Sequence, residues 1–131
     1  METFSVSTNQ RTELVDISGK VKNAISDSGI NEGFAVIYTP HTTAAITINE
    51  NADPSVKSDI KLKIDDVIDN DPRFRHAEEN SDSHIKSSLF DCSEHIIVDG
   101  GRPVLGTWQG IFFCEFDGPR SRKVHVQVVG K

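Results

Sequence analysis

Titratable and hydroxyl side chains are concentrated in one segment of the chain, residues 75–91 (RHAEENSDSHIKSSLFD). His76, Asp82, His84 and Lys86 stand there among further acidic residues and serines. Imidazole and carboxylate groups transfer protons or bind metals, and an ammonium group binds anions. We therefore expect this segment to contribute to a functional site.

Three of the five histidines, His41, His76 and His84, stand in polar segments or at the boundaries of predicted elements. If they converge, they form a three-nitrogen metal site with one position open for water or substrate. His95 and His125 lie in strand-like runs, where we expect no catalytic role. We expect His125 to face solvent or another subunit.

Glu115 interrupts the apolar run GIFFCEF, where strand alternation places it on the same face as Ile111 and Phe113. A carboxylate on an apolar face needs a partner or has a task. The two alternatives are a salt bridge with Arg120 or Arg122 and a catalytic role. Both stay open on the sequence alone.

A turn at residues 117–119 (DGP) precedes Arg120 and Arg122. Guanidinium groups bind carboxylate and phosphate oxygens in bidentate fashion. These arginines are predicted to form an anion pocket with Thr42, Thr43, Ser83 and Lys86. The alternative is surface charge on a hairpin.

Trp108 and Gln109 lie between two glycines in GTWQG, and Trp108 is the only tryptophan. An aromatic face beside an amide can stack on and orient a planar ring. The alternative is a tryptophan that anchors the core at the start of a strand.

The composition indicates one globular domain spanning residues 1–131, with 36% hydrophobic residues. A net charge of -6 argues against nucleic-acid binding through phosphate neutralisation. Cys92 and Cys114 are too few for a disulfide framework, and their neighbours do not indicate a nucleophile. The first ten residues resemble no signal peptide, and no segment is apolar enough for a membrane span. We expect a soluble cytoplasmic protein that does not bind membranes.

Two helices are predicted. The first has Ser18 as N-cap, an apolar face and Gly29 at its left-handed end. The second has Asp53 as N-cap and Pro54 at its first position, and it stops before residues 70–72. We expect its charged face to be solvated surface only; this face comprises Lys57, Asp59, Lys61, Lys63, Asp65 and Asp66.

Strands are predicted near residues 3–7, 34–38 and 43–48, and at three runs in the C-terminal half. The run 34–38 (FAVIY) is apolar throughout, so we expect it to be covered on both faces. These elements predict an α+β fold, mainly antiparallel β-sheets with two main helices in a single domain.

Three motifs carry a resemblance to a known family: PHTTAAITINE (Pro40 to Glu50), NSDSHIKSSL (Asn80 to Leu89) and LGTWQGIFFCEFDGPR (Leu105 to Arg120). In order, spacing and total length the chain resembles the YjbQ-like family over essentially its whole length. The resemblance implies a compact α+β homotrimer rich in antiparallel sheet. The family is commonly labelled a secondary thiamine-phosphate synthase, which joins a pyrimidine methyl diphosphate to a thiazole phosphate and releases pyrophosphate.

The motif positions of the family fall on residues already selected for their chemistry. They are His41, Thr42, Thr43, Asn80, Asp82, His84, Lys86, Trp108, Gln109, Glu115, Asp117 and Arg120. The chain departs from the family pattern at Glu79 and Asp91, where relatives often carry glycine. Aspartate tolerates the left-handed backbone that glycine favours.

The leading hypothesis is a trimeric enzyme acting on a small phosphorylated or diphosphorylated molecule. Arg120 and Lys86 would hold phosphate oxygens, and Asp82 and Glu115 would position a divalent ion, Mg²⁺ or Zn²⁺, or a cationic ring. His41 and His84 would transfer protons or bind metal.

Two alternatives remain. One is a zinc-dependent hydrolase in which the histidines hold the metal and Glu115 acts as base. The other is a non-enzymatic trimer that binds a metabolite or metal.

Overall fold

The computed structural model describes all residues, 1–131, and contains eight strands and three helices. The strands are β1 (Glu2–Ser7), β2 (Glu13–Asp16), β3 (Glu32–Tyr38), β4 (Ala44–Glu50), β5 (Ser93–Asp99), β6 (Arg102–Pro103), β7 (Gln109–Glu115) and β8 (Ser121–Gly130). The helices are α1 (Ser18–Asp27), α2 (Pro54–Val67) and α3 (Ser81–Phe90). The predicted α+β class with antiparallel sheets is confirmed.

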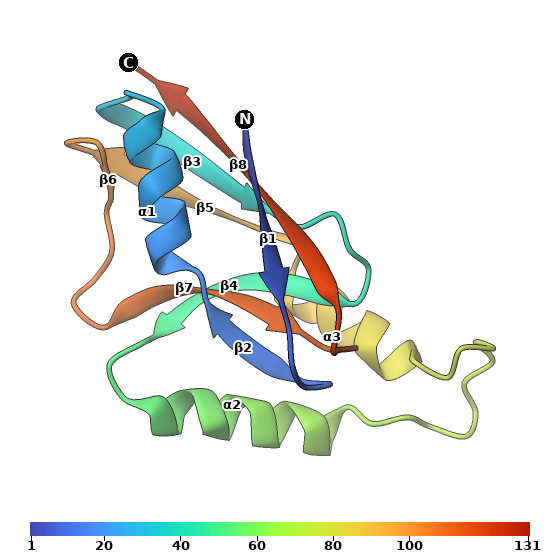
Figure 1. Cartoon of the computed structure of the whole chain (residues 1–131). Helices are drawn as coiled ribbons and strands as arrows, with labels where there is room; N and C mark the ends of the chain where they lie inside the picture. Colours follow the sequence, from blue (N-terminus) through green and yellow to red (C-terminus); the bar gives the residue numbers. More distant parts are fainter.

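The strands form two sheets that cross each other (Figure 1). The larger sheet has the order β1-β8-β3-β5-β6, and the smaller has the order β2-β7-β4. All neighbouring strands are antiparallel. β7 ends where β8 begins, so the turn between them passes from the small sheet to the large one.

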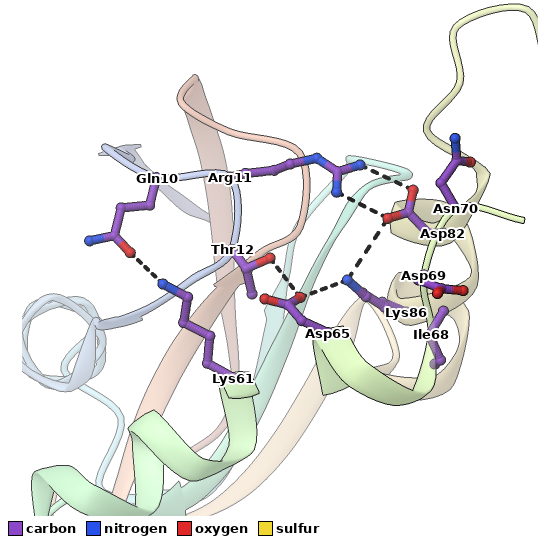
Figure 2. A pocket seen from close by; sticks show the side chains of 10 residues that line it. All are labelled: Gln10, Arg11, Thr12, Lys61, Asp65, Ile68, Asp69, Asn70, Asp82 and Lys86. Atoms are coloured by element: carbon purple, nitrogen blue, oxygen red, sulfur yellow. Dashed lines mark hydrogen bonds and ion pairs between the residues drawn. The ribbon is translucent and has the colours of Figure 1, made fainter. Parts of the chain in front are cut away.

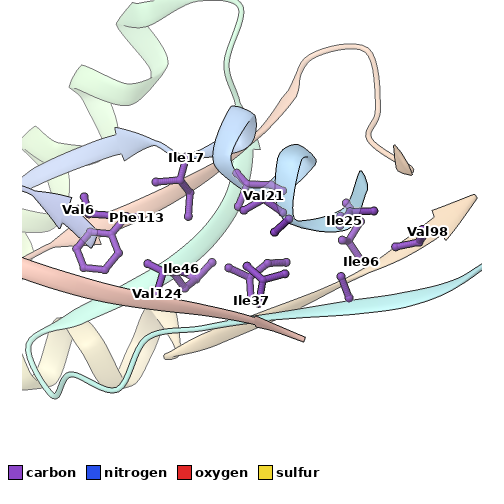
Figure 3. Close-up of a cluster of buried hydrophobic side chains, with 14 of the residues drawn as sticks. Val6, Ile17, Val21, Ile25, Ile37, Ile46, Ile96, Val98, Phe113 and Val124 are labelled. Carbon is purple, nitrogen blue, oxygen red and sulfur yellow. The ribbon is translucent and has the colours of Figure 1, made fainter. Parts of the chain in front are cut away.

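The main core lies between the two sheets and α1 (Figure 3). Val21 and Ile25 of α1 are fully buried against inward-facing residues such as Ile37 and Ile96 of the large sheet. A second, smaller cluster lies on the other face of the small sheet; it comprises Leu14, Ala45, Phe112, Cys114 and Phe116. Residues 110–115 of β7 are therefore all buried, and the strand brings Glu115 to a buried end.

The two predicted helices are confirmed, with one change at a cap. Asp53 caps α2 by accepting a hydrogen bond from the Ser55 amide at 2.9 Å. Ser18 is not the N-cap of α1: Ile17 is, and the Ser18 hydroxyl accepts from the Ile111 amide in β7 instead. Gly29 has φ of 71°, as predicted. No helix is both long and apolar enough to cross a bilayer.

The third helix, α3, was not predicted, and its composition explains why. Its buried face consists of Asp82, Ser83, Lys86 and Ser87, whereas Leu89 is exposed. Sequence patterns identify a helix by apolar residues on its inner face. α3 has the opposite arrangement, so the expected two main helices become three.

The prediction that β3 is covered on both faces is wrong within one chain. Ala35 and Ile37 are buried, but Phe34 and Tyr38 point to the outer face of the large sheet and are 45% and 41% exposed. Ile97 and Val129 on the same face are also exposed, at 65% and 47%.

The two positions where the chain departs from the glycine pattern both have left-handed backbones. Glu79 has φ of 58° and Asp91 has φ of 78°, and they are the only non-glycine residues with positive φ. Both residues flank α3, so the loops on either side of this helix keep the backbone path that glycine would favour.

Candidate functional site

Parts of all three sequence motifs meet at one end of the molecule, where β7 ends, β8 begins and α3 packs (Figure 1). We call this region the motif end. Ser83 of α3 donates to the Phe116 carbonyl at 2.5 Å, and Ser87 donates to the Ala44 carbonyl at 2.5 Å. These hydrogen bonds attach α3 to the other two motifs.

A buried ion pair between Glu115 and Arg122 lies at the centre of the motif end. Arg122 Nε donates to Glu115 Oε1 at 2.9 Å, and Nη2 donates to Oε2. Nη2 also donates to Thr43 Oγ1 at 2.8 Å. Glu115 is fully buried and Arg122 is 4% exposed. The salt-bridge alternative for Glu115 is thus the observed one, with Arg122 as partner.

The Glu115 carboxylate accepts two further hydrogen bonds, from the Thr8 hydroxyl at 2.7 Å and from the Asp117 amide at 3.0 Å. Burial alone would raise its pKa, but the bonds from Arg122 and Thr8 outweigh burial and lower it. Glu115 is therefore ionised at neutral pH. A general base needs a pKa nearer to the working pH and a free lone pair, so this arrangement suits a structural anion better.

Thr8 links this pair to the turn that carries Arg120. Its hydroxyl donates to Glu115 and accepts from the Arg120 amide at 2.9 Å, while the Thr8 amide donates to the Arg120 carbonyl at 2.9 Å. The backbone of Arg120 is therefore held on both sides.

Asp117 directs the Arg120 side chain. Arg120 Nη2 donates to Asp117 Oδ2 at 2.9 Å and Nε donates to the Asp117 carbonyl at 2.8 Å. Asn80 Nδ2 donates to the same carboxylate oxygen at 2.7 Å, and its own Oδ1 is buried without a partner. The guanidinium remains about half exposed, so it can contact a ligand from solvent.

His41 lies beside these cations with one ring nitrogen already used. Its Nε2 accepts a hydrogen bond from the Lys123 amide at 3.0 Å, which places the proton of the neutral ring on Nδ1. Burial, and then the nearby charges of Arg122, Arg120 and Lys123, lower the pKa of His41. At neutral pH His41 is an uncharged donor through Nδ1.

On the other side of α3, a hollow of about 410 Å³ separates it from α2 and the β1–β2 loop (Figure 2). Arg11 donates to Asp82 through its two terminal guanidinium nitrogens, Nη1 and Nη2, at 3.0 and 3.1 Å. Lys86, 1% exposed, donates to Asp65 at 2.8 Å, and Thr12 donates to the same carboxylate at 3.0 Å. Burial opposes ionisation of Asp82, but Arg11 outweighs it and lowers the pKa.

These contacts correct the expectation that the charged face of α2 is only solvated surface. No residue of α2 is buried, and Asp65 joins the helix to Lys86 and Thr12. Lys61 adds a bond to Gln10 at 2.7 Å. The charged face of α2 therefore binds this helix to the rest of the molecule through Asp65 and Lys61.

The predicted three-histidine metal site is only partly assembled by one chain. The rings of His76 and His84 contact each other edge to face, with centroids 5.4 Å apart. His41 does not fit as a ligand in this geometry, because metal at Nδ1 would move its proton to Nε2, which already accepts from Lys123. No group of three or more His, Cys, Asp or Glu side chains is arranged to hold a metal ion. The metal site stays a prediction.

Trp108 and Gln109 lie away from the motif end. They are near the start of β7 and Glu115 is at its other end, roughly 20 Å along the strand at about 3.3 Å per residue. Trp108 is 64% exposed, so the core-anchor alternative is wrong. Gln109 Oε1 accepts from the Gly106 amide. Within one chain this pair does not contribute to the same site as Arg120.

Comparisons with known proteins agree with the geometry. The sequence profile of the family described as UPF0047 protein YjbQ-like matches residues 2–131. The chain belongs to the YjbQ/UPF0047 family.

Two relatives illustrate the match. A UPF0047 protein of Methanocaldococcus jannaschii is 58% identical, with 97% of this chain and 92% of the relative covered. The UPF0047 protein YugU of Bacillus subtilis is 48% identical, with 99% of both chains covered. Neither name states an activity.

Solved structures of the YjbQ/UPF0047 family share the fold. An uncharacterised family protein from Clostridium acetobutylicum superposes with a TM-score of 0.96 at 48% identity, covering 98% of this chain and 100% of that one. A protein of unknown function from Sulfolobus solfataricus gives a TM-score of 0.94 at 34% identity, covering 99% and 96%.

Several residues of the site were missed in the sequence, namely Thr8, Gln10, Arg11, Thr12, Lys61, Asp65 and Lys123. Most lie in the β1–β2 loop or on α2, where polar residues are ordinary. The signal that could have found them is indirect. A helix that buries Asp82 and Lys86 requires an arginine and a carboxylate from elsewhere in the chain.

The contact between α2 and α3 can be tested by substitution. We expect Asp65→Ala to lower the free energy of unfolding by about 2 kcal/mol relative to Asp66→Ala, because it leaves the buried Lys86 ammonium without its nearest acceptor. Asp66 is exposed on the same helix turn and controls for helix propensity. Urea denaturation measures the difference.

Lys86→Met provides a second check. Lys86→Met should lower the free energy of unfolding less in the Asp65→Ala variant than in the natural protein. In that variant the buried ammonium of Lys86 has lost its acceptor, so an apolar side chain there replaces an unpaired charge. Equal stability of the two aspartate variants would contradict the assignment.

Proposed function

We propose that the protein is an enzyme that binds a small phosphorylated or diphosphorylated metabolite at the motif end. His41, Arg120 and Lys123 would receive the phosphate oxygens. The observation that carries this proposal is the orientation of His41, whose Nδ1–H is a neutral donor beside exposed cationic side chains. Donors that are already oriented lose little entropy when an anion binds.

The cations of the motif end divide into two groups. Arg122 and Lys86 are buried and already bind carboxylates, so they support the architecture. Arg120 and Lys123 are exposed, and Asp117 orients the Arg120 guanidinium through two hydrogen bonds. We therefore assign phosphate contact to Arg120 and Lys123 and not to Lys86.

The reaction that the family label implies suits such a cluster. The thiazole nitrogen would use its lone pair to form a bond to the pyrimidine methylene carbon. The bond from that carbon to the diphosphate oxygen would break, and its electron pair would leave on pyrophosphate. No proton moves in this step, and charge grows on the leaving group, where fixed cations and donors stabilise it most.

The remaining motif residues have roles that fit this proposal. Thr42 is exposed beside His41 and can donate to a ligand. Asp82 and Ser83 hold α3 in place through Arg11 and the Phe116 carbonyl. His84 lies partly exposed on α3, and we assign it no role in this step because no proton moves.

A divalent ion, Mg²⁺ or Zn²⁺, would add positive charge at the diphosphate. The histidines and carboxylates of a single chain do not form a group that fits such an ion. We therefore assign no step to a metal.

We also propose that the protein is a homotrimer and that the outer face of the large sheet contacts the neighbouring copy. Phe34, Ile97 and Val129 are paired across β5, β3 and β8 and are 45%, 65% and 47% exposed. On the same face Tyr38 stacks on His125, two residues from Lys123. A neighbour on this face would therefore reach the rim of the site, and could supply the ring-binding pair Trp108 and Gln109.

The reaction is tested with purified protein, the pyrimidine methyl diphosphate and the thiazole phosphate, by measuring thiamine phosphate and pyrophosphate. Arg120→Gln should lower kcat/KM by about 100-fold, since it removes a donor from the developing charge. Arg73→Gln is the matched control because Arg73 also pairs with an aspartate, Asp71, but is exposed and forms no hydrogen bond to a residue of the motif end. It should leave kcat/KM unchanged.

Other outcomes of this assay would contradict the proposal. Equal turnover by natural protein and Arg120→Gln would exclude the phosphate role. Ligand binding without product would favour the non-enzymatic binder. Hydrolysis that depends on stoichiometric zinc and disappears in His41→Ala would favour the hydrolase.

The assembly is tested by light scattering. The natural protein should have three times the mass of one chain, and Phe34→Glu with Ile97→Glu should shift it towards monomer, because charges on a buried apolar contact are costly. Leu62→Glu is the control, since Leu62 is 66% exposed on α2. A monomeric natural protein, or a double variant of unchanged mass, would contradict the proposed interface.

A further inference from the structure

A second hollow is lined by residues of α1, of the segment that follows it and of the β5–β6 hairpin. Figure 1 shows that these elements lie at the opposite end of the molecule from the motif end. The volume of this hollow is about 720 Å³. Small-molecule sites span roughly 300–1,000 Å³. It is larger than the hollow beside α3, and none of the residues that line it belongs to the three family motifs except Leu105.

The charge of this hollow is unusual for an acidic chain. Lys22 of α1 and Arg102 of β6 both line it, and no carboxylate side chain does. Neither residue forms a salt bridge or a side-chain hydrogen bond, whereas Arg11 and Arg120 each bind an aspartate. In a chain of net charge -6, two unpaired cations facing one hollow create a local positive potential.

The walls offer polar and apolar contacts together. Asn23, Ser26 and Asn31 supply amide and hydroxyl groups, and Ile30 and Leu105 supply partly buried apolar surface. This combination suits a ligand with an anionic group and an apolar part better than a bare inorganic ion.

The rim of the hollow is fixed by the hairpin turn. Gly100 and Gly101 have φ of 60° and 73°, left-handed values that favour glycine. The Gly101 amide donates to the Asn31 carbonyl at 3.1 Å, which ties the turn to the loop after α1. The two walls that carry Lys22 and Arg102 are therefore held together without a ligand.

We propose that this hollow binds a small organic phosphate, with Lys22 and Arg102 on the phosphate group and Ile30 and Leu105 against the apolar part. The site is separate from the proposed reaction site and does not depend on that function. A carboxylate ligand shares the anionic chemistry, so the test includes both kinds of anion.

The experiment is an NMR titration of the ¹⁵N-labelled full chain with phenyl phosphate, inorganic phosphate and benzoate, followed through the amides of Gly100, Gly101 and Asn31. Phenyl phosphate should shift these amides with the lowest Kd of the three probes. The double variant Lys22→Gln with Arg102→Gln should raise that Kd by about tenfold or more, because two charge-assisted contacts are lost.

Two controls separate this site from others. Lys20→Gln changes a lysine two residues away whose ammonium binds the Ser5 carbonyl, and it should leave the Kd unchanged. Arg120→Gln should also leave it unchanged, although we expect it to lower the kcat/KM of the proposed reaction.

The proposal is overturned if phenyl phosphate shifts only amides of the motif end, or if the double variant binds it as tightly as the natural protein. Tighter binding of benzoate would overturn the phosphate assignment. Absence of any shift at millimolar probe would overturn the site itself.

Discussion

The buried ion pair between Glu115 and Arg122 is the constraint on which the motif end depends. It joins the last residue of β7 in the small sheet to the second residue of β8 in the large sheet. Leaving either charge alone in the interior would cost about 3–5 kcal/mol. Thr8, Thr43 and the Asp117 amide therefore have to stay where they complete the hydrogen bonds of the pair. These hydrogen bonds therefore fix the turn between the two strands. The exposed side chain of Arg120 extends from this fixed turn.

A second set of charges controls how the helices attach. α3 buries a polar face, and its Asp82 and Lys86 need Arg11 from the β1–β2 loop and Asp65 from α2. α2 in turn buries no residue and relies on those contacts and on a thin apolar layer that includes Ile60. Apolar packing between the sheets and α1 stabilises the core, whereas charged contacts place the helices around the motif end.

Much of the fold was predictable because its elements follow ordinary periodicities. α1 and α2 show helical spacing with recognisable ends, and the strands alternate. Arg122 was one of the two salt-bridge partners predicted for Glu115, since a carboxylate on an apolar face requires a partner. α3 was not predictable by this reasoning, because its inner face is polar.

Sequence patterns also could not predict the contacts across the site. Nothing in the local sequence indicates that the Lys123 amide donates to His41, since the pairing of β3 with β8 brings these distant residues together. Trp108 and Glu115 are close in sequence, but an extended strand separates them. The exposure of Phe34 likewise depends on whether another segment covers the outer face of the large sheet, and the sequence of β3 alone does not show this.

The most direct test of the account is the titration of the Glu115 carboxyl carbon by NMR. Because the folded pKa of Glu115 is lowered, the stability it contributes is present above its ordinary pKa and is lost as the pH falls towards the folded value. The account predicts that Glu115 stays ionised below the range in which exposed glutamates titrate, and that the Thr8 and Asp117 amide signals change together with it when it protonates. Titration at or above the ordinary pKa of glutamate would contradict the claim that an ionised Glu115 organises the motif end.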